Sequence, residues 1–234
     1  MSKSIAIFGA GPGLGQAVAH RYAQSGYEVV LVARRREPLE RLAEELAAEG
    51  ATTHVVTADL ADTEAVPALA EQVRSLVGEL DAFYYGAAAN GFVPVLELTP
   101  ERVREFMPLG VYTLLELVRE FLPAMLSRGD GAILSAQGAS ALHGNPRVAG
   151  GLALAAQRNY LQALHAEVAP KGVYVGGLYI GAAIENSAWH VEQERAKAAG
   201  ESFWEVPSVA PAHLADLLWN MHNARDTAEA QYVR

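Results

Sequence analysis

The chain has 234 residues, 51% of them hydrophobic, and a formal net charge of −9. A chain of this length can bury one sizeable core, and its acidic balance offers no basic surface for nucleic acid or for anionic lipid. Because the sequence contains no cysteine, disulfides, thiolate metal sites and a cysteine nucleophile are excluded, and we expect no metal. The N-terminal residues lack the apolar run of a signal peptide and no stretch reaches the roughly 18 apolar residues of a membrane span, so we expect a cytoplasmic protein without a membrane partner.

The first predicted element is a strand over residues 4–8, which runs into a glycine-rich turn, a helix and a second strand at 28–32. The glycines of the turn are Gly9, Gly11, Gly13 and Gly15. Glycine permits a positive φ and close backbone approach to a ligand, and a helix N-terminus presents unpaired N–H groups and a positive dipole end. Glycine also serves tight turns without any ligand, but between two strands the pattern predicts a site for the pyrophosphate of a dinucleotide.

The second strand ends in "VARRR", where an NAD site carries an acidic residue that binds the ribose 2′-hydroxyl. Ala33 stands at that position, and Arg34 and Arg35 follow it. Guanidinium groups bind a 2′-phosphate through forked, charge-assisted hydrogen bonds, so the pattern favours NADP(H) as the cofactor. The alternative is a solvated basic cluster, although cations are poorly placed at the start of the helix that follows.

Short apolar runs continue to alternate with helical patterns along the rest of the chain. Helices are predicted over residues 37–50 and over 99–128, the second interrupted near Pro108 and Gly110 because proline removes a helical hydrogen bond. The remaining strands are predicted at residues 53–57, 82–85, 132–136, 173–179 and near 230–234. This alternation predicts an α/β fold, a Rossmann-type doubly wound parallel sheet in a single domain over residues 1–234.

Residues 185–207 break the alternation. A loop of this length is often a lid, so we expect a mobile, lid-like insertion over one end of the sheet. Trp189, His190 and Trp204 in this segment are expected to shape or cover a substrate pocket, unless they only pack against one another.

Taken together, these motifs resemble the short-chain dehydrogenase/reductase family over essentially the whole chain. "GAGPGLG" resembles the family's GxxxGxG, "ADLAD" its adenine-contacting Asp, here Asp59, and "YYGAAANG" its Asn-Asn-Ala-Gly. Asp59 also fits a helix cap before residues 63–77. Ile180 and Gly181 stand where the family has Pro-Gly. The resemblance and the glycine pattern imply these cofactor contacts: Gly9, Gly11, Pro12, Gly13, Leu14, Gly15, Arg34, Arg35, Asp59, Leu60, Gly86, Ala87, Ala88 and Gly181.

The family's chemistry comes from Asn, Ser, Tyr and a Lys four residues after the Tyr, which the resemblance places at these positions: Gly110, Gly138, Gly150 and Leu154. A register error of one residue would move the last two to Gly151 and Ala155, which also lack the pair. The resemblance therefore implies a divergent member that lacks the catalytic tetrad. We expect the small apolar replacements to clear volume for a bulky apolar substrate.

Four residues are candidates for the missing proton donor: Gln137, Ser140, His143 and Tyr179. Gln137 could donate a hydrogen bond to a carbonyl, and histidine exchanges protons near neutral pH. Each also has an ordinary structural interpretation, since a strand-end tyrosine usually packs in the core and a loop histidine is usually solvated.

Three functions agree with these observations. The first is an NADP(H)-dependent oxidoreductase with relocated or substrate-assisted proton delivery, which we favour because a detailed phosphate site would be superfluous without nicotinamide chemistry. The second is a non-redox enzyme, a cyclase or isomerase, with structural NADP(H). The third is a catalytically inactive NADP(H)-sensing protein.

The apolar faces of residues 99–128 and of the helix before the sixth strand predict a homodimer or homotetramer.

Overall fold

The computed structural model describes residues 2–89, 91–201 and 204–233. Its centre is a sheet of seven strands, all parallel, in the order β3-β2-β1-β4-β5-β6-β9. The strands are β1 Ser4–Phe8, β2 Glu28–Ala33, β3 Thr53–Thr57, β4 Ala82–Tyr85, β5 Gly131–Gly138, β6 Val173–Gly181 and β9 Glu229–Val233. The order reverses between β1 and β4, so the doubly wound α/β fold predicted from the alternation is confirmed.

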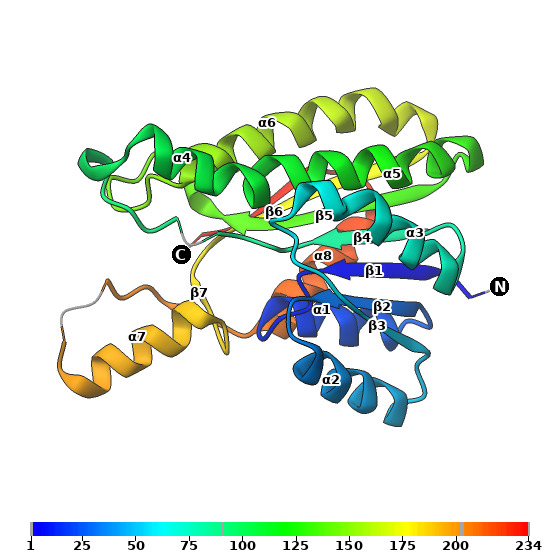
Figure 1. The fold of residues 1–234 in the computed structure, drawn as a ribbon, viewed down its shortest axis with the longest axis horizontal. Helices are drawn as coiled ribbons and strands as arrows, with labels where there is room; N and C mark the ends of the chain where they lie inside the picture. Colours follow the sequence, from blue (N-terminus) through cyan, green and yellow to red (C-terminus); the bar gives the residue numbers. More distant parts are fainter. Residues whose placement is uncertain (1, 90, 202–203, 234) are drawn as a thin grey trace.

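Helices cover both faces of the sheet (Figure 1). The α-helices in the described residues are α1 Leu14–Ala23, α2 Arg36–Ala48, α3 Val66–Val77, α4 Pro100–Met107, α5 Thr113–Arg128, α6 Gly151–Val168, α7 Ala188–Ala199 and α8 Pro211–Ala224. Residues of α1, α2 and α8 form one apolar core against the sheet, and residues of α3, α5 and α6 form another on its opposite face. Strands buried on both faces are expected to be continuous apolar runs, which is how β1 and β4 are built.

The interruption predicted within residues 99–128 is a π-helical turn at Pro108–Tyr112, which joins α4 to α5. Proline has no N–H for the helical hydrogen bond, so the chain widens at this point instead of continuing as a regular α-helix. A π-turn leaves a backbone carbonyl outside the regular hydrogen-bond ladder, and that of Gly110 is used in the site described below.

The segment after β6 forms a small unit beside the main sheet (Figure 1). Short strands β7 (Ala183–Ile184) and β8 (Ser208–Val209) pair in parallel on either side of α7. The amide of Gln193 donates to Val206 O at 3.2 Å and accepts from Val206 N at 3.1 Å, which fixes α7 to the chain that follows it. The predicted insertion at 185–207 therefore contains an ordered helix, and its role as a lid stays a prediction; residues 202 and 203 lie outside the described residues.

Candidate functional site

The glycine turn lies between the end of β1 and the start of α1. Gly9 and Gly13 have φ of +104° and +91°, a conformation that other residues rarely adopt. A Cβ on Gly9 would lie 2.8 Å from Ala87 N, so the turn also packs directly against the loop after β4. The helix begins at Leu14 with no side-chain cap and no acidic residue in its first turn, and its N–H groups are therefore well placed for an anion.

Arg34 and Arg35 follow the end of β2, and both are exposed. In the described part of the chain neither side chain has a hydrogen-bonding or ion-pair partner, whereas the side chain of the next residue, Arg36, pairs with Glu40 at 3.2 Å. The carboxyl ends of β1 and β2 are neighbours in the sheet, so the arginines and the glycine turn share one edge. This arrangement fits the phosphate groups of a dinucleotide that carries a 2′-phosphate.

The other expected cofactor contacts lie at the same edge. Asp59 follows β3 and is exposed; its Oδ1 accepts from Ala61 N at 3.0 Å in a local turn rather than capping the helix that starts later. Leu60 is buried, and Gly86 donates its N–H to Phe8 O at 2.9 Å, which joins the loop after β4 to the end of β1. Gly11, Pro12, Gly15, Ala87, Ala88 and Gly181 complete the group at the ends of β1, β4 and β6.

Gly110, Gly138 and Gly150, the positions at which the resemblance places three members of the tetrad, do not share one cleared volume. A Cβ on Gly150 would lie 2.5 Å from Gly91 Cα, and one on Gly110 would lie 2.7 Å from the Cβ of Ala153. Of these three glycines, only Gly138 would accept a Cβ without a close contact, because the nearest atoms would be Ser140 Oγ at 3.5 Å and Leu154 Cδ1 at 3.8 Å. The expectation that these replacements open a bulky pocket is therefore wrong at positions 110 and 150, where glycine is needed for close packing.

Backbone hydrogen bonds explain the packing at Gly150. The segment after β4 lies alongside the segment before α6, with Gly150 N donating to Gly91 O at 3.1 Å and Ala149 N to Val93 O at 2.9 Å. A third bond joins Val95 N to Pro146 O at 2.8 Å. The backbone of Gly91 thus lies where a side chain at 150 would begin.

A buried polar network lies between β5, α6 and the π-turn. Gln157 donates through Nε2 to Gly110 O at 2.6 Å, and its Oε1 accepts from Ser135 Oγ at 3.0 Å and from Gln137 Nε2. Because Gly110 O can only accept, the amide orientation of Gln157 is fixed, and that of Gln137 follows from it. Gln137 Oε1 is then the atom left without a hydrogen bond among the described residues. The Nε2 of Gln137, a candidate donor to a substrate carbonyl, is engaged within this network, and its role as a donor stays a prediction.

Gln157 was not among the residues predicted from the sequence. It is 2% exposed and lies four residues after Ala153 and four before Leu161, which are both buried on the same face of α6. A lone amide within an apolar stripe of i, i+4 spacing was the available signal.

Tyr179 points away from the carboxyl edge of the sheet. Its hydroxyl donates to Glu229 Oε1 at 3.2 Å. A Cβ on Gly177, two residues earlier in β6, would lie only 2.7 Å from the same hydroxyl oxygen. Arg158 holds the same carboxylate through two hydrogen bonds of 2.9 and 2.8 Å. Burial, followed by the Glu229 carboxylate, raises the pKa of Tyr179 well above its usual range. The role of this hydroxyl in the structure is to join β6 to β9.

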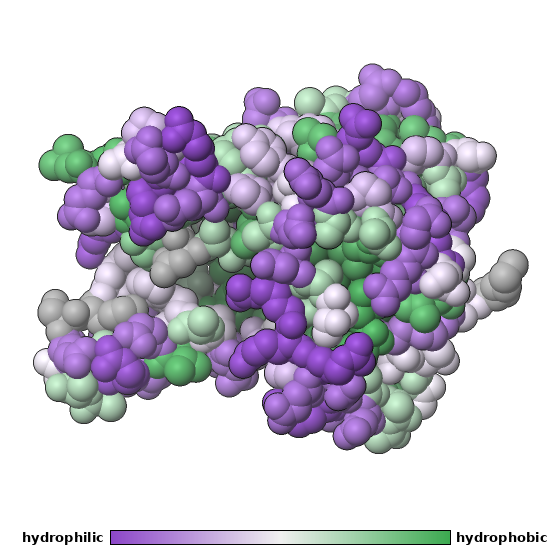
Figure 2. Space-filling model, viewed as in Figure 1, coloured by the Kyte–Doolittle hydropathy of each residue, from purple (hydrophilic) through white to green (hydrophobic). Residues whose placement is uncertain are grey.

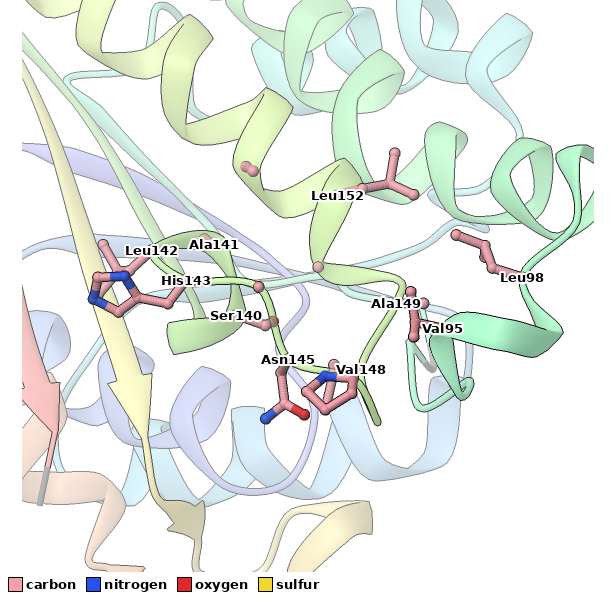
Figure 3. Close-up of a pocket in the computed structure, with 14 residues that line it drawn as sticks. Val95, Leu98, Ser140, Ala141, Leu142, His143, Asn145, Val148, Ala149 and Leu152 are labelled. Atoms are coloured by element: carbon pink, nitrogen blue, oxygen red, sulfur yellow. The ribbon is translucent and has the colours of Figure 1, made fainter.

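Ser140 and His143 line a pocket of about 370 Å³ beside the N-terminus of α6 (Figure 3). Ser140 belongs to the short helix that follows β5, and His143 is exposed in the next loop. Val95, Leu98 and Leu152 form the apolar wall. Of the four proton-donor candidates, these two line the same pocket, whereas Gln137 and Tyr179 belong to separate networks.

An aromatic cluster joins the α7 unit to the loop after β4. The ring of Phe92 stacks on Trp189 with centroids 3.9 Å apart, and Trp204 packs edge-on against both rings. The guanidinium of Arg147 lies 4.7 Å from the ring centroid of Trp204. The surface is hollowed between the α4 region and α7 (Figure 2). His190 contributes its backbone N–H to Ser187 Oγ, the N-cap of α7.

A seven-stranded parallel sheet with a glycine turn at the carboxyl end of β1 defines a Rossmann-type α/β protein. The family model described as short chain dehydrogenase matches residues 3–195. The chain therefore belongs to the short chain dehydrogenase family. No helix in the ranges that the structure describes is long and apolar enough to cross a membrane, and these ranges contain no group of three or more His, Asp or Glu side chains placed to hold a metal ion.

Two curated relatives and one solved structure illustrate the similarity. The chain is 35% identical over 136 residues to a fatty acyl-CoA reductase of Mycobacterium tuberculosis, covering 57% of this chain and 46% of the relative. It is 36% identical over 135 residues to a 1-deoxy-11-beta-hydroxypentalenate dehydrogenase of Streptomyces arenae, covering 57% and 48%. The chain thus spans about half the length of these curated relatives.

The solved structure is an NADPH-bound short chain oxidoreductase from Pseudomonas aeruginosa PAO1, described as containing an atypical catalytic center. It is 25% identical to this chain, with a TM-score of 0.84 over 99% of this chain and 95% of the other.

Proposed function

We propose that this chain is an oxidoreductase that binds NADP(H) and acts on an apolar carbonyl or related small molecule through a non-standard proton donor. The observation that carries the proposal is the pair of exposed arginines, Arg34 and Arg35, beside the glycine turn, with no carboxylate partner among the described residues. Cofactor bound at this edge would supply hydride to the substrate. The similarity to an NADPH-bound oxidoreductase described as containing an atypical catalytic center supports both the cofactor and the non-standard proton donor of the proposal.

The chain's own residues bind and orient the cofactor. The N-terminus of α1 and the glycine turn hold the pyrophosphate, and the two arginines hold the 2′-phosphate. Neither step needs the family's tetrad, whose positions carry Gly110, Gly138, Gly150 and Leu154.

We assign proton delivery to the side chains of Ser140 and His143, which line the pocket beside α6. The supporting observation is that both residues line the pocket, whereas the Tyr179 hydroxyl is bonded to Glu229 and the Gln137 amide N–H groups face Ser135 and Gln157. An imidazole can act as acid or base near neutral pH, and a serine hydroxyl can relay a proton to it.

Thermal shift with NADPH and NADH tests the cofactor assignment. A ligand at about 100 times its dissociation constant stabilises the folded chain by roughly 2.7 kcal/mol, so NADPH should raise the melting temperature more than NADH. The variant Arg34→Ala/Arg35→Ala should lose that preference, while Arg36→Ala, whose side chain is already paired with Glu40, should keep it. Equal shifts from both cofactors in the parent would refute the assignment.

The proposal includes an assembly and a location. We expect a homodimer or homotetramer in the cytoplasm, without nucleic acid. Light scattering checks the assembly: a monomeric mass at micromolar concentration would contradict it.

A further inference from the structure

The pocket beside α6 has a wall made by two elements that are far apart in sequence. Val95 and Leu98 come from the short helix after β4 and its end, and Leu152 and Ala155 come from the first turns of α6. Leu98 and Leu152 extend toward one another at one end of the pocket, and His143 lies at the other (Figure 3). We call this pocket the α6 groove.

The lining of the α6 groove carries no carboxylate, lysine or arginine. Its polar side chains are Ser140, His143 and Asn145, and Asn145 Oδ1 already accepts from Arg147 N at 2.9 Å. A charged ligand would therefore be desolvated without a counter-charge, which is unfavourable. The groove suits an uncharged ligand with a hydrogen-bonding group at one end and hydrocarbon at the other.

The apolar wall is open to solvent. The exposed fractions of Val95 and Leu152 are 52% and 41%. A ligand that covers these side chains gains the free energy of removing their surface, and its own, from water. The groove's volume of about 370 Å³ lies near the lower end of the range typical of small-molecule sites, which favours a slim chain over a bulky ring system.

We infer that the α6 groove is the binding site for the unbranched aliphatic chain of the substrate, with the polar end of that substrate at Ser140 and His143. This inference rests on the proposed function and narrows its substrate from an apolar carbonyl or related small molecule to a long-chain alcohol or carbonyl. The similarity to a fatty acyl-CoA reductase over part of the chain is consistent with it.

The test measures the affinity of four uncharged probes, butanol, hexanol, octanol and decanol, by isothermal titration calorimetry in the absence of cofactor. Because each buried methylene is worth about 0.8 kcal/mol, affinity should rise by about fourfold for every added methylene. Leu152→Arg should flatten this dependence. The matched control is Leu96→Arg, because Leu96 is 97% exposed on the same short helix as Val95 and does not line the groove.

Four outcomes are informative. If alkanol affinity rises steeply with chain length, and this rise is lost in Leu152→Arg and kept in Leu96→Arg, the assignment of the α6 groove to the aliphatic chain is supported. If affinity does not rise with chain length in the parent, or if both variants have equal effects, the assignment is overturned, even where NADPH binds and the proposed function stands. If alkanols bind steeply but no carbonyl consumes NADPH, the groove stands and the proposed function fails. If Leu152→Arg lowers the mass in light scattering and leaves alkanol affinity unchanged, the groove is a contact between copies of this chain and the inference is overturned.

Discussion

Replacing Gly150 by alanine should destabilise the protein, whereas the same replacement at Gly138 should not. Both residues have backbone angles that alanine adopts freely, with φ of −61° and −64°. The entropic gain from restricting the unfolded chain is therefore the same in both variants, about 0.4–1 kcal/mol, and it cancels in their difference. The difference that remains is steric.

The magnitude follows from what each new Cβ would meet. At Gly150 it would lie 2.5 Å from Gly91 Cα and 3.0 Å from Gly91 O, both of them backbone atoms that cannot rotate away. At Gly138 the nearest atom would be 3.5 Å distant, an ordinary contact. Overpacking of this kind costs about 1–3 kcal/mol, so Gly150→Ala should melt roughly 2–12 °C below Gly138→Ala.

Differential scanning calorimetry and urea unfolding provide the assay. Equal stability of the two alanine variants would refute the argument that position 150 is closed by the backbone of Gly91. It would also restore the idea of cleared volume, and a tyrosine at 150 would then be worth building.

Three further predictions concern other parts of the chain. Burial, followed by nearby cations, lowers the pKa of His222 to about 4, so the folded state disfavours the protonated imidazole. The free energy of unfolding should therefore fall by about 3 kcal/mol at most as pH falls from about 6.5 toward 4. In His222→Gln, urea unfolding should show a free energy of unfolding that depends less on pH over that window. Tyr179→Phe should lose about 0.5–1.5 kcal/mol of stability with the bond to Glu229 but keep turnover within about twofold, because the hydroxyl does not face the pocket. A loss of about 10²-fold in turnover would instead make Tyr179 the proton donor. Phe92→Ala should expose Trp189 and shift tryptophan emission to longer wavelength, and unchanged emission would argue against the stacked pair.

The fold could be predicted from the sequence because each strand is a short apolar run bounded by turn residues. The predicted strands at 4–8, 53–57 and 82–85 have the same bounds in the structure, and the others differ by one or two residues. The glycine turn and the interruption at Pro108 could also be predicted from the sequence, since glycine and proline act on the local backbone.

The candidate site was less accessible to sequence reasoning because it depends on contacts between distant segments. Nothing local at Gly150 shows that Gly91 packs against it, so a glycine required by close packing was interpreted as empty space. The orientation of the Gln137 amide follows from its contact with Gln157 and from that of Gln157 with Gly110 O, and these three residues come from three separate elements. Such chains of contact need the tertiary structure.

The central claim is that the chain transfers hydride from NADPH without the family's tetrad, and NADPH deuterated at the transferring position of nicotinamide C4 tests it most directly. The deuterated cofactor is incubated with a panel of aliphatic aldehydes and ketones, and the products are analysed by mass spectrometry. The account predicts deuterium on the former carbonyl carbon in the parent, and loss of that label in Ser140→Ala/His143→Ala with NADPH binding unchanged. NADPH that binds with the expected preference over NADH, while no carbonyl in the panel receives deuterium, would contradict the account and favour a structural or sensing role for the cofactor.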